Sequence, residues 1–205
     1  MTGRTLKTKA LKTKDTREKI LEAALALFSK KGFLGAATKD IASEAGVAEV
    51  TLFRHFPTKE SLLEGVIRSY SFLPELKGLM AEIEGFTYRE ALREISSRFL
   101  KTLRARKELI RIMFSEIPLY PAKAKEIHHN LLDEMTKTLA SYFRGLQKKG
   151  ALRRFDPEAG ARAFMGLFFA FFTSQELCCR ERLGNEEAER IFKEYIEIFA
   201  RGTLK

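Results

Sequence analysis

Tryptophan is absent from the 205-residue chain, and cysteine, histidine and proline are scarce, with two, three and five residues respectively. The two cysteines, Cys178 and Cys179, are adjacent, and neighbouring residues on a helix point about 100° apart, so a disulfide between them would be strained. We therefore expect a reduced, cytoplasmic chain. The N-terminus lacks the apolar stretch of a secretory signal, and the longest strongly apolar run, residues 163–172, is shorter than the roughly 20 residues that a membrane span needs. We predict no membrane segment.

Motifs for covalent catalysis and for cofactor binding are also missing. The sequence contains no Gly-x-Ser-x-Gly, no glycine-rich phosphate-binding loop and no His-Glu-x-x-His. His128 and His129 cannot bind one metal ion together from adjacent helical positions, although His129 and Asp133, four residues apart, could share one. We predict neither a metal nor a cofactor, and an enzyme is the weakest of the functional hypotheses.

Acidic residues are missing from the first 14 positions, which hold five Lys or Arg residues. The whole chain carries 37 Lys and Arg against 27 Asp and Glu, a net charge of +10. Residues 1–60 hold 12 basic and 7 acidic residues, a net charge of +5, so they carry more than twice the positive charge per residue of the remainder. Such an excess favours a polyanionic partner, and we expect residues 1–14 to form a flexible basic arm.

Alternation of apolar and polar residues over the length of a strand is absent, whereas helical spacing recurs throughout. We predict an all-α fold of about nine helices. Residues 15–70 hold four of them and form a predicted N-terminal DNA-binding domain. The helical pattern weakens around Pro74 and Gly85, beyond which residues 71–205 form a larger predicted ligand-binding and dimerisation domain. The helices of that domain cover about residues 88–106, 107–116, 121–149, 157–182 and 186–201.

Helix ends are marked in the N-terminal part. Asp15, with Glu18 three residues later, has the pattern of a capping box at the first helix, and Gly32 ends that helix. Thr38 caps the second helix and Thr58 the fourth. The third helix is the short segment from about Ala48 to His55.

Residues 38–55 have the pattern of a helix-turn-helix. Two helices that cross steeply at a tight turn need a small residue where their backbones approach, a residue free to adopt positive φ, and an apolar side chain in the angle between them. Ala42, Gly46 and Leu52 supply these in order. The second helix of such a motif enters the major groove of DNA with its N-terminal residues at the base edges.

Four stretches near the N-terminus form a longer pattern in a fixed order: FSKKGF (28–33), TKDIA (38–42), AGV (45–47) and LFRHFPTKESL (52–62). With the amphipathic first helix before them, they resemble the TetR family of one-component transcriptional regulators. The resemblance covers residues 16 to about 67. Beyond them the chain matches that family only in the number and length of its helices.

The resemblance implies a set of DNA contacts. Thr38 and Lys59, at the starts of the second and fourth helices, would hold phosphates, helped by the positive ends of those helices. The short third helix would read bases and touch the backbone of the groove. Its alternative role is an ordinary solvated surface. Ala48, Glu49 and Val50 are the expected base readers, with further contacts from Thr51, Phe53, Arg54 and His55.

The larger domain offers two sets of apolar residues. Residues 163–172 are apolar on every side and the last predicted helix has a wide apolar stripe, so the two helices are candidates for a self-complementary dimer contact, which the resemblance also implies. The interface candidates are Phe169, Phe172, Phe192, Tyr195 and Phe199. Other aromatic and apolar residues line a ligand cavity or simply pack in the core. These ligand-binding candidates are Phe99, Leu103, Met113, Phe114, Tyr142, Phe143, Phe164 and Phe168.

Two charged residues of this domain, Glu116 and Arg162, could orient an effector, although each could instead be an exposed or ion-paired surface group. We predict a homodimeric repressor that a small hydrophobic or amphipathic effector releases from double-stranded DNA at a near-palindromic operator. The alternative is a helical sensor or interaction protein without sequence-specific DNA binding. The sequence leaves open whether the effector releases or promotes DNA binding.

Overall fold

The computed structural model describes residues 15–178 and 183–205. The predicted basic arm, residues 1–14, and Cys179 lie outside the described residues. The described residues are mostly helical and contain no β-strand, which confirms the predicted all-α fold. The α-helices are α1 (Thr16–Gly35), α2 (Thr38–Glu44), α3 (Glu49–His55), α4 (Lys59–Tyr70), α5 (Leu73–Glu82), α6 (Tyr88–Ala105), α7 (Lys107–Glu116), α8 (Ala122–Lys148), α9 (Pro157–Phe172) and α10 (Asn185–Thr203). Short 3-10 turns cover Ile83–Gly85 and Ile117–Leu119, and a π-helical segment covers Thr173–Cys178.

Helix α5 occupies the region in which the sequence predicts a boundary. Leu73, Leu76 and Leu79 recur at three-residue intervals and are all buried. Pro74 is tolerated because it lies in the first turn, where its missing N–H has no helical partner to lose. The helix packs against α8, so this stretch belongs to the body of the molecule.

The helix ends follow the predicted pattern in part. Thr58 caps α4: its side chain accepts a hydrogen bond from the Ser61 N–H at 3.0 Å, and Ser61 Oγ accepts one from the Thr58 N–H at 3.1 Å. Gly32 interrupts α1 with φ 78° and ψ 169°, a conformation that is essentially restricted to glycine, so the regular part of α1 ends there as predicted. The capping box predicted at Asp15 is wrong, because the exposed Asp15 side chain makes no capping hydrogen bond.

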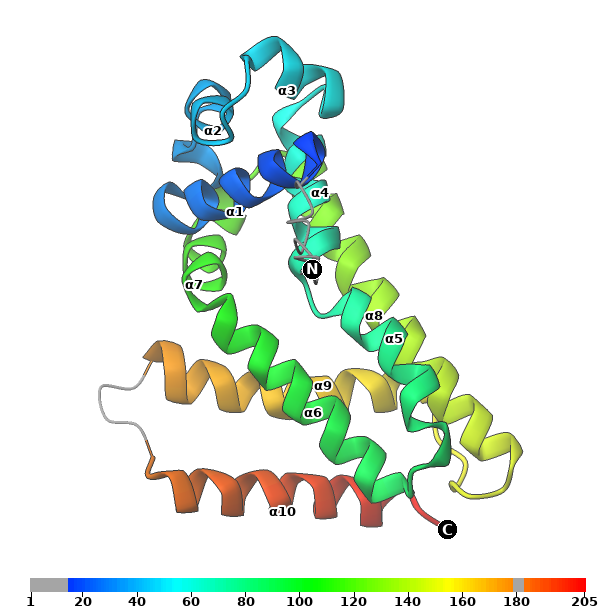
Figure 1. The fold of residues 1–205 in the computed structure, drawn as a ribbon. Coiled ribbons are helices and arrows are strands. Elements are labelled where there is room, and N and C mark those ends of the chain that lie inside the picture. Colours follow the sequence, from blue (N-terminus) through cyan, green and yellow to red (C-terminus); the bar gives the residue numbers. More distant parts are fainter. Residues whose placement is uncertain (1–14, 179–182) are drawn as a thin grey trace, which may run out of the picture.

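Figure 1 shows an elongated arrangement with two ends. Helices α2 and α3 lie at one end, and α9 and α10 lie at the other. Helix α4 leads from α3 into the middle of the molecule, where it packs against α8, and α7 continues from α6 to reach α1. No helix in the described ranges is long and apolar enough to cross a membrane.

The buried side chains form two hydrophobic clusters. We call helices α1–α4 the head, and the cluster that fills it the head cluster. The head cluster also includes five residues from beyond α4, namely Leu109, Met113, Tyr120, Ala124 and Ile127. The second cluster is formed by α5, α6, α8, α9 and α10 and is rich in phenylalanine. We call the part of the molecule from α5 to α10 the body. The head and the body are therefore held together by shared apolar packing.

Candidate DNA-binding surface and ligand cavity

Helices α2 and α3 form the predicted helix-turn-helix. Ala42 and Leu52 are buried where the two helices meet, and Gly46 has φ 68° in the turn between them. The turn is fixed by a hydrogen bond from the Val47 N–H to the Ala42 carbonyl at 3.0 Å. Each of the three residues thus has the structural role that the spacing predicts.

The outer face of α3 presents side chains to solvent. Val50 is 76% exposed and Phe53 40% exposed, so both side chains are accessible on this face. Arg54 is also exposed, while Thr51 and His55 are half-buried. Ala48 is exposed and immediately precedes the helix. This exposed face of α3 is the one to which the sequence analysis assigns the DNA contacts.

Thr38 and Glu49, two of the predicted DNA contacts, are bonded to each other. The Thr38 hydroxyl donates to Glu49 Oε1 at 2.7 Å, and this bond joins the start of α2 to the first turn of α3. Thr38 therefore does not cap its own helix as predicted: Ala37 is the residue before α2, and the Thr38 side chain makes no capping bond. The carboxylate of Glu49 thus helps to position α3 relative to α2.

Lys59, the other predicted phosphate contact, is anchored to the end of α1. Its Nζ donates to the Leu34 carbonyl at 3.2 Å and lies 4.8 Å from the centre of the Phe33 ring. Partial burial lowers the pKa of this ammonium group. Its phosphate contact stays a prediction, and the structure adds a role in joining α4 to α1.

Glu116, at the end of α7, joins the body to the same segment of the head. Its Oε2 accepts hydrogen bonds from the Phe33 N–H at 2.8 Å, from the Leu34 N–H at 3.4 Å and from the Tyr120 hydroxyl at 3.1 Å. The Glu116 side chain can come this close to α1 only because residue 32 is a glycine, since a Cβ atom at Gly32 would lie 2.0 Å from Glu116 Oε1. We call this arrangement the Glu116 clamp.

A cavity of about 570 Å³ lies between α4, α6, α7, α8 and α9, and we call it the central cavity. This volume is within the range of about 300–1,000 Å³ that is usual for small-molecule sites. Four predicted ligand-binding residues line it: Phe99, Leu103, Met113 and Phe114. Phe114 is 53% exposed and Leu132, which also lines the cavity, 48% exposed, so an apolar rim reaches the surface between α7 and α8.

The other four predicted ligand-binding residues do not line the central cavity, and the structure corrects their assignment. Tyr142, Phe143, Phe164 and Phe168 belong to or pack against the second hydrophobic cluster. The Phe143 ring centre lies 5.7 Å from that of Phe199 and 6.5 Å from that of Phe164. Helix α10 covers these rings, so they are core residues.

Several residues of the central cavity were missed by the sequence analysis. Val66, Ile67 and Tyr70 line it from the inner end of α4, and Arg106 and Thr136 add polar groups. The sequence gives no separate signal for the α4 residues, because Val66 and Ile67 are also members of the head cluster and Tyr70 packs against it. Three polar residues named in the sequence analysis also line the cavity: His128, His129 and Arg162, of which Arg162 is the predicted candidate for orienting an effector.

The predicted dimer residues are placed differently from one another. Phe172 and Phe199 are buried within the protomer, so they cannot meet a second copy directly, and Phe169 lines the central cavity, where its ring stacks on Phe114 at 5.8 Å. Phe192 and Tyr195 are half-buried beside Phe168. The outer faces of α9 and α10 instead expose Ala163, Ala170 and Ile198, and the exposed Gly166 lines the central cavity.

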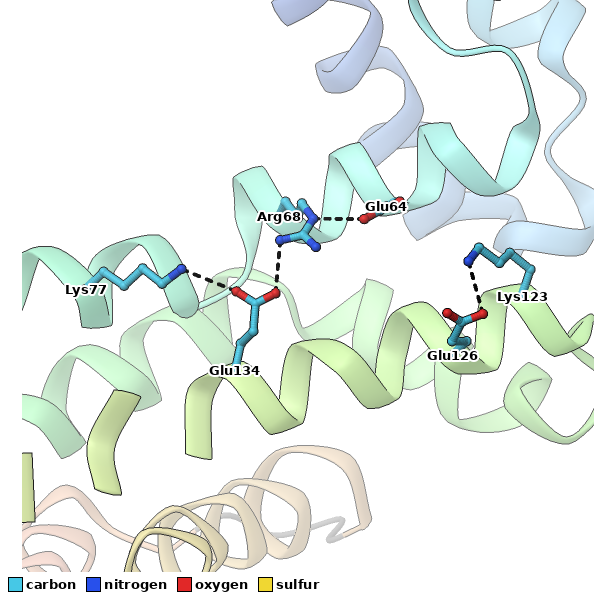
Figure 2. A network of polar contacts seen from close by, with 6 residues as sticks. All are labelled: Glu64, Arg68, Lys77, Lys123, Glu126 and Glu134. Carbon is cyan, nitrogen blue, oxygen red and sulfur yellow. Dashed lines mark hydrogen bonds and ion pairs between the residues drawn. The ribbon is translucent and has the colours of Figure 1, made fainter. Parts of the chain in front are cut away.

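A polar network joins α4 to α8 on the side of α8 that faces away from the central cavity. Figure 2 shows Arg68 of α4 between two carboxylates, with 2.9 Å to Glu64 and 3.1 Å to Glu134 of α8. Glu134 also forms an ion pair with Lys77 of α5, whose Nζ lies 3.3 Å from Glu134 Oε2. The residues before and after Glu134, Asp133 and Met135, line the cavity. A displacement of this turn of α8 would therefore act on α4 through the ion pair between Glu134 and Arg68.

Among the residues that the structure describes, no group of three or more His, Cys, Asp or Glu side chains could hold a metal ion. Burial lowers the pKa of His128, with a smaller contribution from the neighbouring His129, and so favours the neutral imidazole.

Two family models match the chain. Residues 20–66 match the model of bacterial regulatory proteins of the tetR family, and residues 90–202 match the C-terminal domain of AefR-like transcriptional repressors. The uncharacterized HTH-type transcriptional regulator YvkB of Bacillus subtilis is 28% identical over 190 residues, which cover 91% of this chain and 96% of YvkB.

Solved structures have the same fold. A TetR-family regulator from Mesorhizobium loti superposes with a TM-score of 0.76 at 22% identity, covering 93% of this chain and 97% of that one. AibR, solved in complex with isovaleryl coenzyme A and operator DNA, superposes with a TM-score of 0.60 at 20% identity, covering 90% of this chain and 97% of AibR.

Proposed function

Because the chain belongs to the TetR family of transcriptional regulators, we propose that it is a homodimeric repressor that a small amphipathic effector releases from its operator. The observation that carries this proposal is the course of α4. The Thr58 cap at its outer end follows directly on α3, and Val66, Ile67 and Tyr70 at its inner end line the central cavity. One rigid helix thus connects the DNA-reading surface to the cavity wall.

An effector in the central cavity would act on α4 from three directions. It would touch the inner end of α4 directly, displace α8 and so pull on Arg68 through Glu134, and displace α7 and so move the Glu116 clamp. Two reading heads bind DNA well only at one separation, so a ligand that favours a different separation lowers operator affinity. We assign residues 15–70 to DNA binding and residues 71–205 to effector binding and dimerisation, with residues 1–14 as a basic arm.

The DNA side of the proposal uses the exposed face of α3 and the two flanking helix starts. Arg54 and Val50 are exposed and would reach the groove, and Thr38, at the start of α2, would hold a phosphate. We assign DNA contacts to the predicted set: Thr38, Ala48, Glu49, Val50, Thr51, Phe53, Arg54, His55 and Lys59. This activity belongs in the cytoplasm, where bacterial DNA lies.

For dimerisation we propose the outer faces of α9 and α10. The exposed Ala163 and Ala170 share one side of α9 and allow close approach of a second helix, and the exposed Ile198 adds an apolar contact on α10. Two copies would present two α3 helices to half-sites about 34 Å apart, which calls for a near-palindromic operator.

AibR supports the combination of ligand and DNA binding in one chain, because a protein of this fold holds both isovaleryl coenzyme A and operator DNA in one crystal. The test is a selection of bound sequences from random DNA, followed by mobility-shift titration of the selected site. Arg54→Ala should weaken binding and lower the salt slope by about one, because it removes one cation that neutralises a DNA phosphate.

Arg144→Ala, which removes an exposed arginine of α8 far from the head, is the matched control and should leave both quantities unchanged. Failure of the selection to yield a common sequence would favour the alternative of a helical sensor without sequence-specific DNA binding.

A further inference from the structure

The central cavity is apolar over most of its wall but has one polar end. Helix α8 supplies His128, His129 and Asp133 there, and α9 supplies Arg162. These groups lie close together: the pKa of the Asp133 carboxyl is lowered chiefly by its hydrogen bond from Lys137 and further by the charges of His129 and Arg162. We call these four lining residues the polar end.

The charges at the polar end do not cancel. Asp133 is already neutralised by Lys137, whose Nζ lies 2.7 Å from Asp133 Oδ2. Arg162 has a much looser partner, because its Nη2 lies 3.9 Å from Glu158 Oε2 and both side chains are largely exposed. An interaction at that distance in solvent contributes little, so the Arg162 guanidinium keeps its charge and its donors for another anion.

The second arginine that lines the cavity, Arg106, already interacts with α4. Arg106 Nε donates to the Tyr70 carbonyl at 3.4 Å, and its guanidinium lies 5.1 Å from the centre of the Tyr70 ring. Arg106 therefore contributes to the junction of α4 with the body, and of the two arginines Arg162 is the one that lies beside the polar residues of α8.

We propose that the effector is a carboxylate-bearing amphiphile whose carboxylate is bound at the polar end by Arg162, with His128 and His129 as further hydrogen-bond donors. Its alkyl part lies among the apolar side chains of the same cavity, including Phe99, Met113, Phe114 and Phe169. This inference rests on the proposed function, because it names the chemical class of ligand for the effector site.

The chemistry of the polar end selects this class over others. A guanidinium presents paired N–H donors that match the two oxygens of a carboxylate, which gives both charge and geometry. His128 is half-buried and favours the neutral imidazole, so it can donate one N–H without adding charge. An ammonium headgroup would face the uncompensated Arg162. A doubly charged phosphate would have one available cation where it needs more.

The test compares three ligands with the same alkyl chain by calorimetric titration of the whole chain without DNA, below their critical micelle concentrations. Decanoate should bind at least about tenfold more tightly than decan-1-ol, because a charge-assisted pair is worth more than a neutral hydrogen bond. Decylammonium should bind more weakly than decan-1-ol. Arg162→Gln should remove the preference for decanoate and leave the affinity for decan-1-ol unchanged.

Arg144→Gln is the matched control, since Arg144 is exposed on α8 and does not line the cavity. It should keep the preference for decanoate. Equal binding of the three ligands, no binding of any of them, or a preference that survives in Arg162→Gln would each overturn the assignment. An Arg162-dependent preference for decanoate without any change of operator affinity would support the assignment and refute the effector role in the proposed function.

Discussion

The Glu116 clamp allows a quantitative test of how the body controls the head. We consider Glu116→Gln, which keeps the size of the side chain and one acceptor oxygen but removes the charge. In the structure a single oxygen, Oε2, accepts two bonds of ordinary length, from the Phe33 N–H at 2.8 Å and the Tyr120 hydroxyl at 3.1 Å. The third, from the Leu34 N–H at 3.4 Å, is long.

Hydrogen bonds to a charged group contribute about 1.5–3 kcal/mol and those between neutral groups about 0.5–1.5 kcal/mol, so each of the two ordinary bonds should lose about 1 kcal/mol. We therefore expect Glu116→Gln to lower the free energy of unfolding by about 2 kcal/mol. For an effector that weakens operator binding about 100-fold, the coupling free energy is about 2.7 kcal/mol. If the clamp carries that coupling, the variant should respond to the effector by only about 3-fold to 10-fold.

The assays are urea unfolding and operator titration with and without effector. Glu126→Gln is the matched control, because Glu126 forms an exposed ion pair with Lys123 at 3.0 Å on the surface of α8 (Figure 2). This control should change stability by less than about 0.5 kcal/mol and keep the full response. A Glu116→Gln variant with the stability and the effector response of the unmodified protein would show that the clamp is neither a stabilising contact nor a route of coupling.

Other substitutions test the remaining parts of the structure. Gly32→Ala should lower the thermal stability by more than Gly46→Ala does. Both glycines have positive φ, but only the methyl group at position 32 would meet a neighbouring carboxylate, that of Glu116. Equal losses of stability in the two variants would contradict the close approach of Glu116 to Gly32. Ile198 is 62% exposed, so Ile198→Glu should give a folded protein that sediments as a monomer and binds the operator poorly. Phe199→Glu should instead unfold the chain, because Phe199 is buried. An Ile198→Glu protein that remains dimeric would exclude the proposed interface. Glu49→Ala should cost about 0.5–1.5 kcal/mol and change the preferred base at one operator position, and an unaltered binding-site selection would leave Glu49 as a purely structural residue.

The helix-turn-helix could be predicted because its determinants are local. Ala42, Gly46 and Leu52 lie within 11 residues of one another, and a turn that needs positive φ marks itself by glycine. Helix α5 could not be read in the same way, because Pro74 and Gly78 dilute its apolar pattern. A proline in the first turn is compatible with a helix, although it reads as a breaker.

The cavity residues could be predicted only in part, since helical spacing shows which side chains face inward but not what covers them. Phe99 and Phe143 both lie on inward faces, yet Phe99 lines the cavity and Phe143 is covered by α10. The same limit applies to two of the interface candidates, Phe172 and Phe199, which are buried within their own protomer. Polar residues such as Arg162 carry no periodic signal, and only the packing of α8 against α9 gives it a place at a cavity.

The head cluster has a consequence for the modular use of this protein. Leu109, Met113 and Tyr120 complete the apolar interior of the head, although they follow α4 by some 40 residues or more of sequence. A fragment cut after α4 would expose the surfaces that these side chains cover. A chimeric regulator that borrows this DNA-reading head must therefore bring the matching faces of α7 and the start of α8, so the portable unit in an exchange of specificities is discontinuous in the chain.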